Sequence, residues 1–230
     1  MQRNVLEERP PKTLIWVTIA IFVLIMGMML SLFGEKLPEA ITISTKGQPT
    51  IGYPKAPVQV VVFKEPKCIN CKEFNDNIYP KIKEDFIDTN KVKYTVIPVS
   101  FLPGSMPAAT SLLCVYYADP LYPNNELFFT YLDYMYDHQP PEHLDWATLD
   151  KLTQMAHSAS PAINTQKLRK CIERETYRVK IEQNNSYGRK IMGGTLSTPT
   201  VYVNGILVKE LSYSAIQKLI NELLEQKGVN

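Results

Sequence analysis

The apolar positions of this chain first form an unbroken run and only later alternate with polar ones. Residues 13–33 carry no charged side chain over twenty-one positions. A helix of this length rises about 30 Å, which matches the hydrocarbon core of a bilayer. A cleaved signal peptide is the alternative, but its apolar region is usually about 7–15 residues long, and no A-x-A-like cleavage site precedes Glu35. The run therefore predicts a single transmembrane anchor.

The charges on either side of this run predict its orientation. Three basic residues precede it, and only Lys36 closely follows it. Because basic residues tend to stay on the cytoplasmic side of a membrane, residues 1–12 are expected in the cytoplasm and the rest of the chain outside it. Residues 34–53 are polar and interrupted by prolines, as expected of a tether. The remaining chain, 54–230, is expected to form one extracytoplasmic domain.

This domain begins with a pattern typical of a β-α-β unit. An apolar run at 58–63, interrupted only by Gln59, indicates a buried strand, and a second strand pattern follows at 92–99. Between them, apolar residues recur every four positions from Phe74 to Phe86, which indicates a helix with a kink at Pro80. A helical connection of this kind joins two parallel strands.

The second half of the domain is helical before it returns to strands. Prolines separate four predicted helices, at 107–118, 125–138, 146–158 and 164–187. Strand pattern returns at 200–208, where Asn204-Gly205 indicates a hairpin with a type I′ turn, and an amphipathic helix follows at about 212–226. The order predicts an α/β fold, βαβ…ββα, with an inserted helical block over about 105–190.

Composition and charge argue against a nucleic-acid partner and against a metal site. The formal net charge is +2 and no long basic run appears, so nucleic acid is not an expected partner. The three histidines fall in the predicted helical block without regular metal-ligand spacing, so they do not predict a metal site.

The candidate chemistry lies at Cys68-Ile69-Asn70-Cys71, between the first strand and the first helix. Backbone N–H groups and the helix dipole stabilise a thiolate at such a position and lower the pKa of Cys68. Cys71, one turn further on, lies within reach of the same sulfur, so the pair can open and close a disulfide. A zinc site and an inert disulfide are the alternatives, but structural zinc needs four ligands, and the other cysteines stand alone.

Three motifs together resemble the DsbA-type subfamily of bacterial thiol-disulfide oxidoreductases, which have a thioredoxin-like fold with a helical insertion. They are Ala56-Pro57-Val58 before the first strand, the Cys68-Ile69-Asn70-Cys71 motif with Pro66 before it and Phe74 after it, and Ser197-Thr198-Pro199-Thr200-Val201-Tyr202-Val203-Asn204-Gly205. The resemblance implies that Cys68 attacks, that Cys71 resolves and that no cofactor is needed. It also implies a cis Thr198–Pro199 bond beside the cysteines, with both residues positioning the substrate chain.

The dipeptide between the cysteines departs from this resemblance. Strongly oxidising DsbA proteins typically have Pro-His there, whereas Ile69-Asn70 supplies neither a charge nor a ring donor. Asn70 is expected to offer an amide hydrogen bond, and Lys67 a nearby cation, so part of the thiolate stabilisation remains. We therefore expect a milder oxidant, with a reduction potential between roughly −270 and −120 mV.

Three further residues carry open alternatives. Glu65 is interpreted as a solvated carboxylate at the end of a strand; the alternative is a buried proton acceptor for Cys71. Cys114 and Cys171 are either buried small hydrophobes or a structural disulfide. A bridge is favoured because unpaired cysteines are uncommon outside the cytosol and some DsbA-like proteins carry a second bridge.

Together these features predict a membrane-anchored thiol-disulfide oxidoreductase of the bacterial inner membrane, with its catalytic domain in the periplasm or extracytoplasmic space. Its expected substrates are cysteine pairs in secreted or envelope proteins, and a DsbB-like membrane protein is the expected redox partner. A reductase or isomerase kept reduced by a membrane electron donor is the alternative. A module of thioredoxin fold that binds clients without catalysis is a second alternative.

Overall fold

A computed structural model describes residues 12–32 and 37–228 and divides the chain into two compact units, Met1–Pro38 and Glu39–Asn230. The first unit contains helix α1 (Lys12–Leu32). Within the described part of the chain, no helix combines the length and the apolar character needed to cross a membrane. The prediction of a transmembrane helix over residues 13–33 is therefore not supported. Most of the predicted cytoplasmic segment, 1–12, lies outside the described residues.

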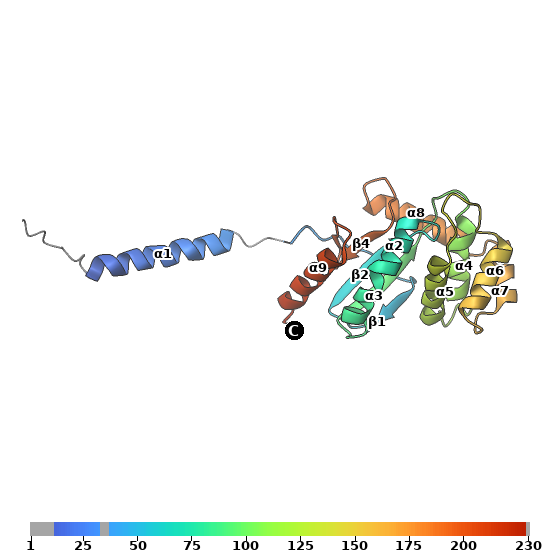
Figure 1. The fold of residues 1–230 in the computed structure, drawn as a ribbon, viewed down its shortest axis with the longest axis horizontal. Helices are drawn as coiled ribbons and strands as arrows, with labels where there is room; N and C mark the ends of the chain where they lie inside the picture. Colours follow the sequence, from blue (N-terminus) through green and yellow to red (C-terminus); the bar gives the residue numbers. More distant parts are fainter. Residues whose placement is uncertain (1–11, 33–36, 229–230) are drawn as a thin grey trace, which may run out of the picture. The chain divides into compact units, whose positions relative to one another are not determined.

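The second unit is built around a five-stranded sheet of order β1-β3-β2-β4-β5 (Figure 1). The central strand β2 pairs parallel with β3 and antiparallel with β4, while β1 and β5 pair antiparallel at the two edges. Because β2 has a neighbour on each side and helices over both faces, its sequence is a nearly continuous apolar run. The strands are β1 (Thr50–Gly52), β2 (Val58–Lys64), β3 (Val92–Pro98), β4 (Thr200–Val203) and β5 (Ile206–Leu207).

The connection from β2 to β3 consists of three short helical segments. They are α2 (Ile69–Asn77), α3 (Tyr79–Ile82) and the π-helical turn η1 (Lys83–Ile87). Pro80 lies in the first turn of α3. Its ring lacks an N–H donor and clashes with the preceding turn, so the predicted kink is a break between two helices.

The segment between β3 and β4 is helical, as predicted, with five helices in place of the four expected. They are α4 (Met106–Tyr116), α5 (Asn125–Asp137), α6 (Leu149–Ala159), α7 (Thr165–Glu173) and α8 (Arg178–Ile191). The prediction of one helix over 164–187 is wrong, because the chain turns between α7 and α8 with Glu175 at a φ of 48°. A left-handed residue of this kind ends a helix.

The chain then returns to the sheet through the hairpin and ends in α9 (Tyr213–Gln226), capped by Ser212. Asn204 and Gly205 both have positive φ, 46° and 82°, as the type I′ turn requires. The edge strand β1 lies in the segment predicted as a tether, and after it the order βαβ, helical block, ββα is the predicted one.

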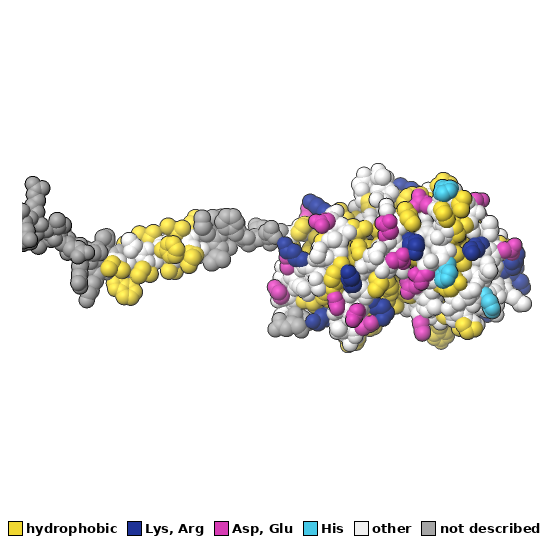
Figure 2. All heavy atoms as spheres, in the orientation of Figure 1, with side chains coloured by type: hydrophobic (Ala, Val, Ile, Leu, Met, Phe, Trp, Pro, Cys, Tyr) yellow, Lys and Arg dark blue, Asp and Glu magenta, His cyan; other side chains and the backbone are white. Residues whose placement is uncertain are grey.

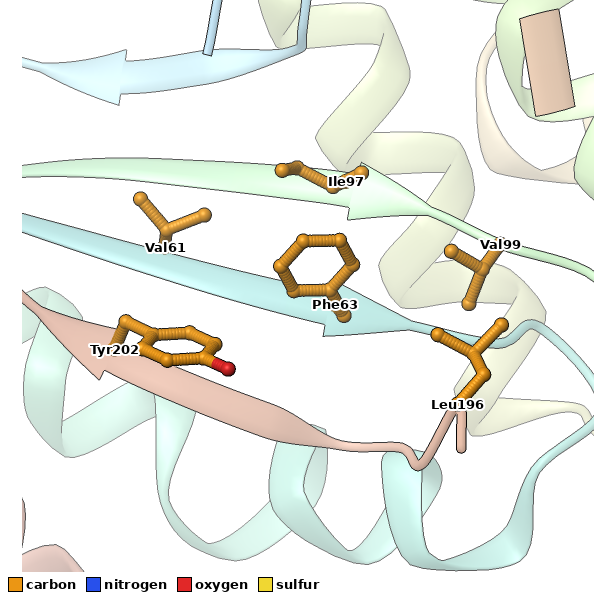
Figure 3. Packing of buried hydrophobic residues seen from close by; sticks show 6 residues of the cluster. All are labelled: Val61, Phe63, Ile97, Val99, Leu196 and Tyr202. Atoms are coloured by element: carbon orange, nitrogen blue, oxygen red, sulfur yellow. The ribbon is translucent and has the colours of Figure 1, made fainter. Parts of the chain in front are cut away.

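A compact hydrophobic cluster supports one face of the sheet (Figure 3). It contains Val61, Phe63, Ile97, Val99, Leu196 and Tyr202, with partly buried residues of α8 packed against it. Gly188 of α8 permits this approach, because a Cβ there would lie 2.5 Å from Leu196 Cδ1. Because neighbouring residues of a strand alternate between faces, Val62 and Lys64 point to the opposite side.

Candidate active site

The two cysteines of the CxxC motif lie where β2 passes into α2. Cys68 is the N-cap residue of α2, and Cys71 lies in its first turn. Both are free thiols; Cys68 retains 7% of its surface exposed, whereas Cys71 has none. The helix start therefore presents one accessible and one buried sulfur.

The surroundings of Cys68 stabilise its thiolate. They lower the pKa of Cys68 to about 6, first through a hydrogen bond from the Cys71 thiol and then through Thr198 and the backbone N–H groups of Cys71 and Asn70. Burial acts in the opposite direction but is outweighed. The Thr198 hydroxyl is buried without another hydrogen-bond partner, and the Thr198 carbonyl oxygen lies 3.5 Å from Cys68 Sγ. At neutral pH this sulfur is a nucleophile.

The surroundings of Cys71 have the opposite effect. Burial raises the pKa of Cys71 well above its ordinary value, and the adjacent Cys68 thiolate adds to this shift. The backbone N–H of Glu65 donates to Cys71 Sγ over 3.4 Å. The reduced site thus holds one thiolate and one thiol, which is the division needed for one sulfur to attack and the other to resolve.

Glu65 is fully buried, so its interpretation as a solvated carboxylate is wrong. Tyr136 of α5 covers the end of β2 and donates to the Glu65 carbonyl oxygen over 3.2 Å. The carboxylate accepts a bond from the Lys67 backbone N–H through Oε2, while Oε1 has no partner. Burial raises the pKa of Glu65 to about 7. The burial of the carboxyl group agrees with the alternative interpretation, and its role as a proton acceptor for Cys71 stays a prediction.

Lys67 and Asn70 have partners that the sequence did not indicate. The Lys67 ammonium group is buried and donates to the carbonyl oxygens of Pro103 and Leu144, both at 2.9 Å. It connects the active-site turn to the helical block. Asn70 supports the Cys68 thiolate through its backbone N–H. Ile69 is 44% exposed, and its N–H donates to a carboxylate of the helical block, Glu142 Oε2, over 2.9 Å.

The cis Thr198–Pro199 bond lies beside the cysteines at the entry to β4. A pocket opens next to it, between the first turns of α2 and the segment before α9. It is lined by Asn70, Glu73, Phe74, Asn77, Ile78, Thr198, Pro199 and Leu211. Sequence reasoning placed Thr198 and Pro199 here but missed Glu73 and Leu211, which reach the pocket only through tertiary packing.

Lys64 is the other residue that sequence reasoning missed. Its side chain is 2% exposed, and Nζ donates to Asn75 Oδ1 over 2.6 Å. Burial lowers the pKa of Lys64 to about 8. Strand alternation was the available signal, because Lys64 shares the face of Val62 in the run that follows Val58.

Away from this site, Cys114 of α4 and Cys171 of α7 form a disulfide, with an S–S distance of 2.04 Å. The favoured alternative of the sequence analysis is thus the one present. Over residues 12–32 and 37–228, no group of three or more His, Cys, Asp or Glu side chains is arranged to hold a metal ion. On the face shown in Figure 2, acidic and basic side chains of the second unit are interspersed.

Comparisons with known proteins agree with this geometry. A family model described as "Thioredoxin" matches residues 44–222. The chain is 34% identical to "Disulfide bond formation protein D" of Bacillus subtilis over 186 residues, which cover 80% of each chain. The crystal structure of Chlamydia trachomatis DsbA is 36% identical with a TM-score of 0.75, covering 84% of this chain and all of that one. The structure of oxidised BdbD from Bacillus subtilis is 33% identical with a TM-score of 0.73, covering 83% and 100%.

A thioredoxin-like sheet with paired cysteines at the start of its first helix defines a class, the protein thiol-disulfide oxidoreductases. Their chemistry resides in the sulfurs, so they use a redox-active disulfide without a bound cofactor. Within this class the chain belongs to the DsbA-type branch of the thioredoxin family.

Proposed function

We propose that this protein oxidises cysteine pairs in secreted or envelope proteins, with Cys68 and Cys71 as its catalytic residues. The observation that carries the proposal is the division of charge between the two sulfurs, with the pKa of Cys68 lowered to about 6 and that of Cys71 raised. A disulfide is a stronger oxidant when its reduced form is stabilised. The stabilised thiolate therefore favours transfer of the disulfide to a client.

The exchange proceeds in two displacements. A client thiolate attacks Cys68 Sγ, the Cys68–Cys71 bond breaks, and the electron pair leaves on Cys71, which takes up a proton. The second client thiol loses its proton and attacks the client sulfur of the mixed disulfide, and the electron pair leaves on Cys68 as a thiolate. The client loses two electrons and gains a disulfide, while the enzyme is left as a dithiol.

Two neighbours of the cysteines assist these steps. Glu65 has a pKa of about 7, and its backbone N–H contacts Cys71 Sγ, so its buried carboxyl group is the proposed proton acceptor for Cys71 near neutral pH. Thr198 and Pro199 line the adjacent pocket and position the client chain beside Cys68. A backbone at this place pairs with an extended client as an added strand does.

We assign this activity to an extracytoplasmic compartment. The Cys114–Cys171 disulfide supports the assignment, because such bonds persist in oxidising compartments and are rare in the cytosol. Each turnover leaves the enzyme reduced, so continued activity requires an oxidant. A DsbB-like, quinone-linked membrane protein has the required chemistry and is the proposed redox partner.

A single-turnover experiment tests the activity. The oxidised chain is mixed with an equimolar reduced peptide that contains two cysteines, and both partners are quenched with acid and alkylated. One peptide disulfide is expected for each enzyme disulfide consumed. Cys68→Ser is expected to abolish the transfer. Reduced Cys71→Ser, mixed instead with the oxidised peptide, is expected to trap a mixed disulfide, because the Cys68 thiolate attacks the peptide disulfide, one peptide sulfur leaves as a thiolate, and Cys71 is absent and cannot resolve the bond. Transfer that survives Cys68→Ser would contradict the proposal.

Reduction or isomerisation of client disulfides is the second candidate. The observation that favours it is the Ile69-Asn70 dipeptide, which brings no charged or ring donor to Cys68. With a less stabilised thiolate the enzyme disulfide would be a weaker oxidant, and a membrane electron donor would keep the pair reduced. The two candidates differ in the reduction potential that they require.

A further inference from the structure

Lys64 occupies a position where a charged side chain is costly. It ends the central strand β2, and its ammonium group lies over three aromatic rings, 5.3 Å from the centroid of Phe74, 5.2 Å from Tyr79 and 5.1 Å from Tyr136. Only 2% of the residue is exposed. Burying an ammonium ion costs several kcal/mol unless nearby groups compensate, and an apolar side chain would fill such a space at lower cost. Cation–π attraction to the three rings offsets part of this desolvation cost.

The polar partners of Lys64 form a short chain that ends at a carboxylate. Nζ donates to Asn75 Oδ1 over 2.6 Å, and Asn75 Nδ2 donates to Asp133 Oδ1 over 3.2 Å. The amide thus separates the ammonium from the carboxylate, so the charge of Lys64 is positioned by Asp133 without direct pairing to it.

The backbone next to Lys64 contacts the redox pair, because the N–H of the following residue, Glu65, donates to Cys71 Sγ over 3.4 Å. A Cys71 thiolate would raise the pKa of Lys64, so the two groups interact electrostatically. Tyr136 links them structurally, since its ring contacts Lys64 and its hydroxyl binds the Glu65 carbonyl, next to the N–H that reaches Cys71. The titratable and charged groups that face Lys64 are Cys71 and Asp76 of α2, Tyr79 of α3, and Asp133 and Tyr136 of α5.

We propose that Lys64, held by Asn75 and Asp133, is a positioning residue that supplies positive charge beneath Cys71 and so favours the reduced form of the Cys68/Cys71 pair. Opening the enzyme disulfide places an electron pair on the buried Cys71 sulfur, where water does not solvate it. The ammonium group compensates that charge until the sulfur takes up its proton. Because the disulfide is neutral and the reduced pair keeps one thiolate, at Cys68, the positive charge of Lys64 stabilises the reduced site more than the oxidised one.

This inference rests on the proposed exchange through Cys68 and Cys71. In this proposal Lys64 raises the oxidising power of the Cys68/Cys71 disulfide independently of the dipeptide between the cysteines. The Pro-His dipeptide expected of a strong oxidant is absent, and Lys64 acts on the buried sulfur from the opposite side of the motif. The lysine is thus expected to offset part of what Ile69-Asn70 lacks.

The first test compares Lys64→Met with the full-length wild type. Methionine is similar in length and unbranched, so it can occupy the aromatic enclosure without a charge. Equilibration with glutathione is expected to show an equilibrium constant for reduction of the enzyme about tenfold lower, equivalent to a potential about 30 mV more negative. The matched control is Lys72→Met, which removes a partly exposed cation one residue after Cys71, and it is expected to leave the constant within twofold.

A kinetic readout separates this effect from a structural defect. Reaction of the reduced protein with a dithiobis(nitrobenzoate) reagent forms a mixed disulfide at Cys68, which Cys71 then resolves with release of a coloured thiolate. The rate of release follows the fraction of Cys71 thiolate. Its pH profile is expected to move to higher pH in Lys64→Met and to stay in place in Lys72→Met.

A measurement on the unmodified chain covers the case in which Lys64→Met does not fold. Lysine side chains labelled at Nζ are titrated by NMR in the oxidised and the reduced protein. The Lys64 signal is expected to titrate at higher pH in the reduced protein, because the site then carries a negative charge. Equal titration in both redox states would overturn the inference, as would an unchanged equilibrium constant and pH profile in folded Lys64→Met. Loss of the proposed function itself would appear separately, as absence of client oxidation by the wild type.

Discussion

At the scale of single residues, the activity depends on an unequal pair of sulfurs. Cys68 caps α2 and is stabilised as a thiolate by the thiol three residues away, whereas Cys71 is surrounded by protein. The asymmetry arises from the helix start, which directs N–H groups toward the first sulfur and buries the second. Ile69 and Asn70, the uncharged residues between the two cysteines, do not remove this difference between the sulfurs.

The thiolate of Cys68 is directly measurable. Ultraviolet absorbance of the reduced protein at the thiolate band is expected to titrate with a midpoint at about pH 6, the pKa to which hydrogen bonds from Cys71 and Thr198 lower this group. Cys68→Ser removes the signal and serves as the control. A midpoint near the ordinary thiol value of about 8.5 would contradict the account of the site.

Glu65→Gln tests the buried carboxyl group. The pKa of Glu65 is raised to about 7 in the folded protein, so the stability associated with the protonated group is complete below its unfolded value of 4.5 and is lost as the pH rises through 7. Glutamine has no such dependence. Between pH 4.5 and pH 8, the unfolding free energy of wild type is expected to fall by about 3 kcal/mol relative to Glu65→Gln. A constant difference between the two reduced proteins across this range, measured by denaturant unfolding, would show that Glu65 does not titrate near 7.

The sequence identified the reactive residues, gave burial of Glu65 only as the less favoured alternative, and did not indicate Lys64. Two cysteines at helix spacing after a strand, and Thr198-Pro199 before a second strand, have local patterns that point to their chemistry. Strand alternation places Lys64 on the face of Val62, but charged residues at a strand end, such as Lys64 and Glu65, normally face solvent. Their burial depends on Tyr136 and its helix, which are more than sixty residues away in the sequence.

At the scale of elements, the inserted helices complete the site. Helix α5 supplies Tyr136 and Asp133, and the segment before α6 supplies the carbonyl oxygen that binds Lys67. The prediction of the first three inserted helices came close to their observed bounds because prolines and capping residues mark their ends. The break between α7 and α8 was not predicted. Glu175 adopts a left-handed conformation there, whereas glycine or asparagine is the residue that usually indicates this conformation in a sequence.

The bridge between α4 and α7 is expected to stabilise this block. Replacing both Cys114 and Cys171 by serine opens a loop that spans 57 residues of sequence. The chain-entropy model gives a loss of about 4 kcal/mol for a loop of this length, and removal of native bridges typically costs about 2–5 kcal/mol. Denaturant unfolding of the oxidised proteins provides the measurement.

Single-turnover exchange of the double serine variant provides the control for this prediction. Its transfer activity is expected to remain, because the catalytic cysteines lie on a different helix, α2. Loss of exchange in a folded double variant would indicate that the second bridge takes part in catalysis. An unchanged unfolding free energy would show that the bridge does not support the block.

At the scale of the whole molecule, the thioredoxin-like half and the helical block both contact the short turn from Glu65 to Cys71. The sheet holds the cysteines beside Thr198, and the helical block holds Lys67, Glu65 and Lys64 from the other side. The order of strands and helices was predictable from hydrophobic periodicity. The electrostatic balance at their junction was not, because it depends on which charged groups the two halves enclose together.

The reduction potential of Cys68/Cys71 in the full chain, equilibrated against glutathione buffers, tests the central claim most directly. The stabilised Cys68 thiolate and the buried Lys64 predict a value above roughly −180 mV, so that the pair prefers to be reduced and gives its disulfide to clients. A value near roughly −270 mV, that of thioredoxin, would contradict oxidation of clients and favour a reductase or isomerase supplied with electrons from a membrane donor.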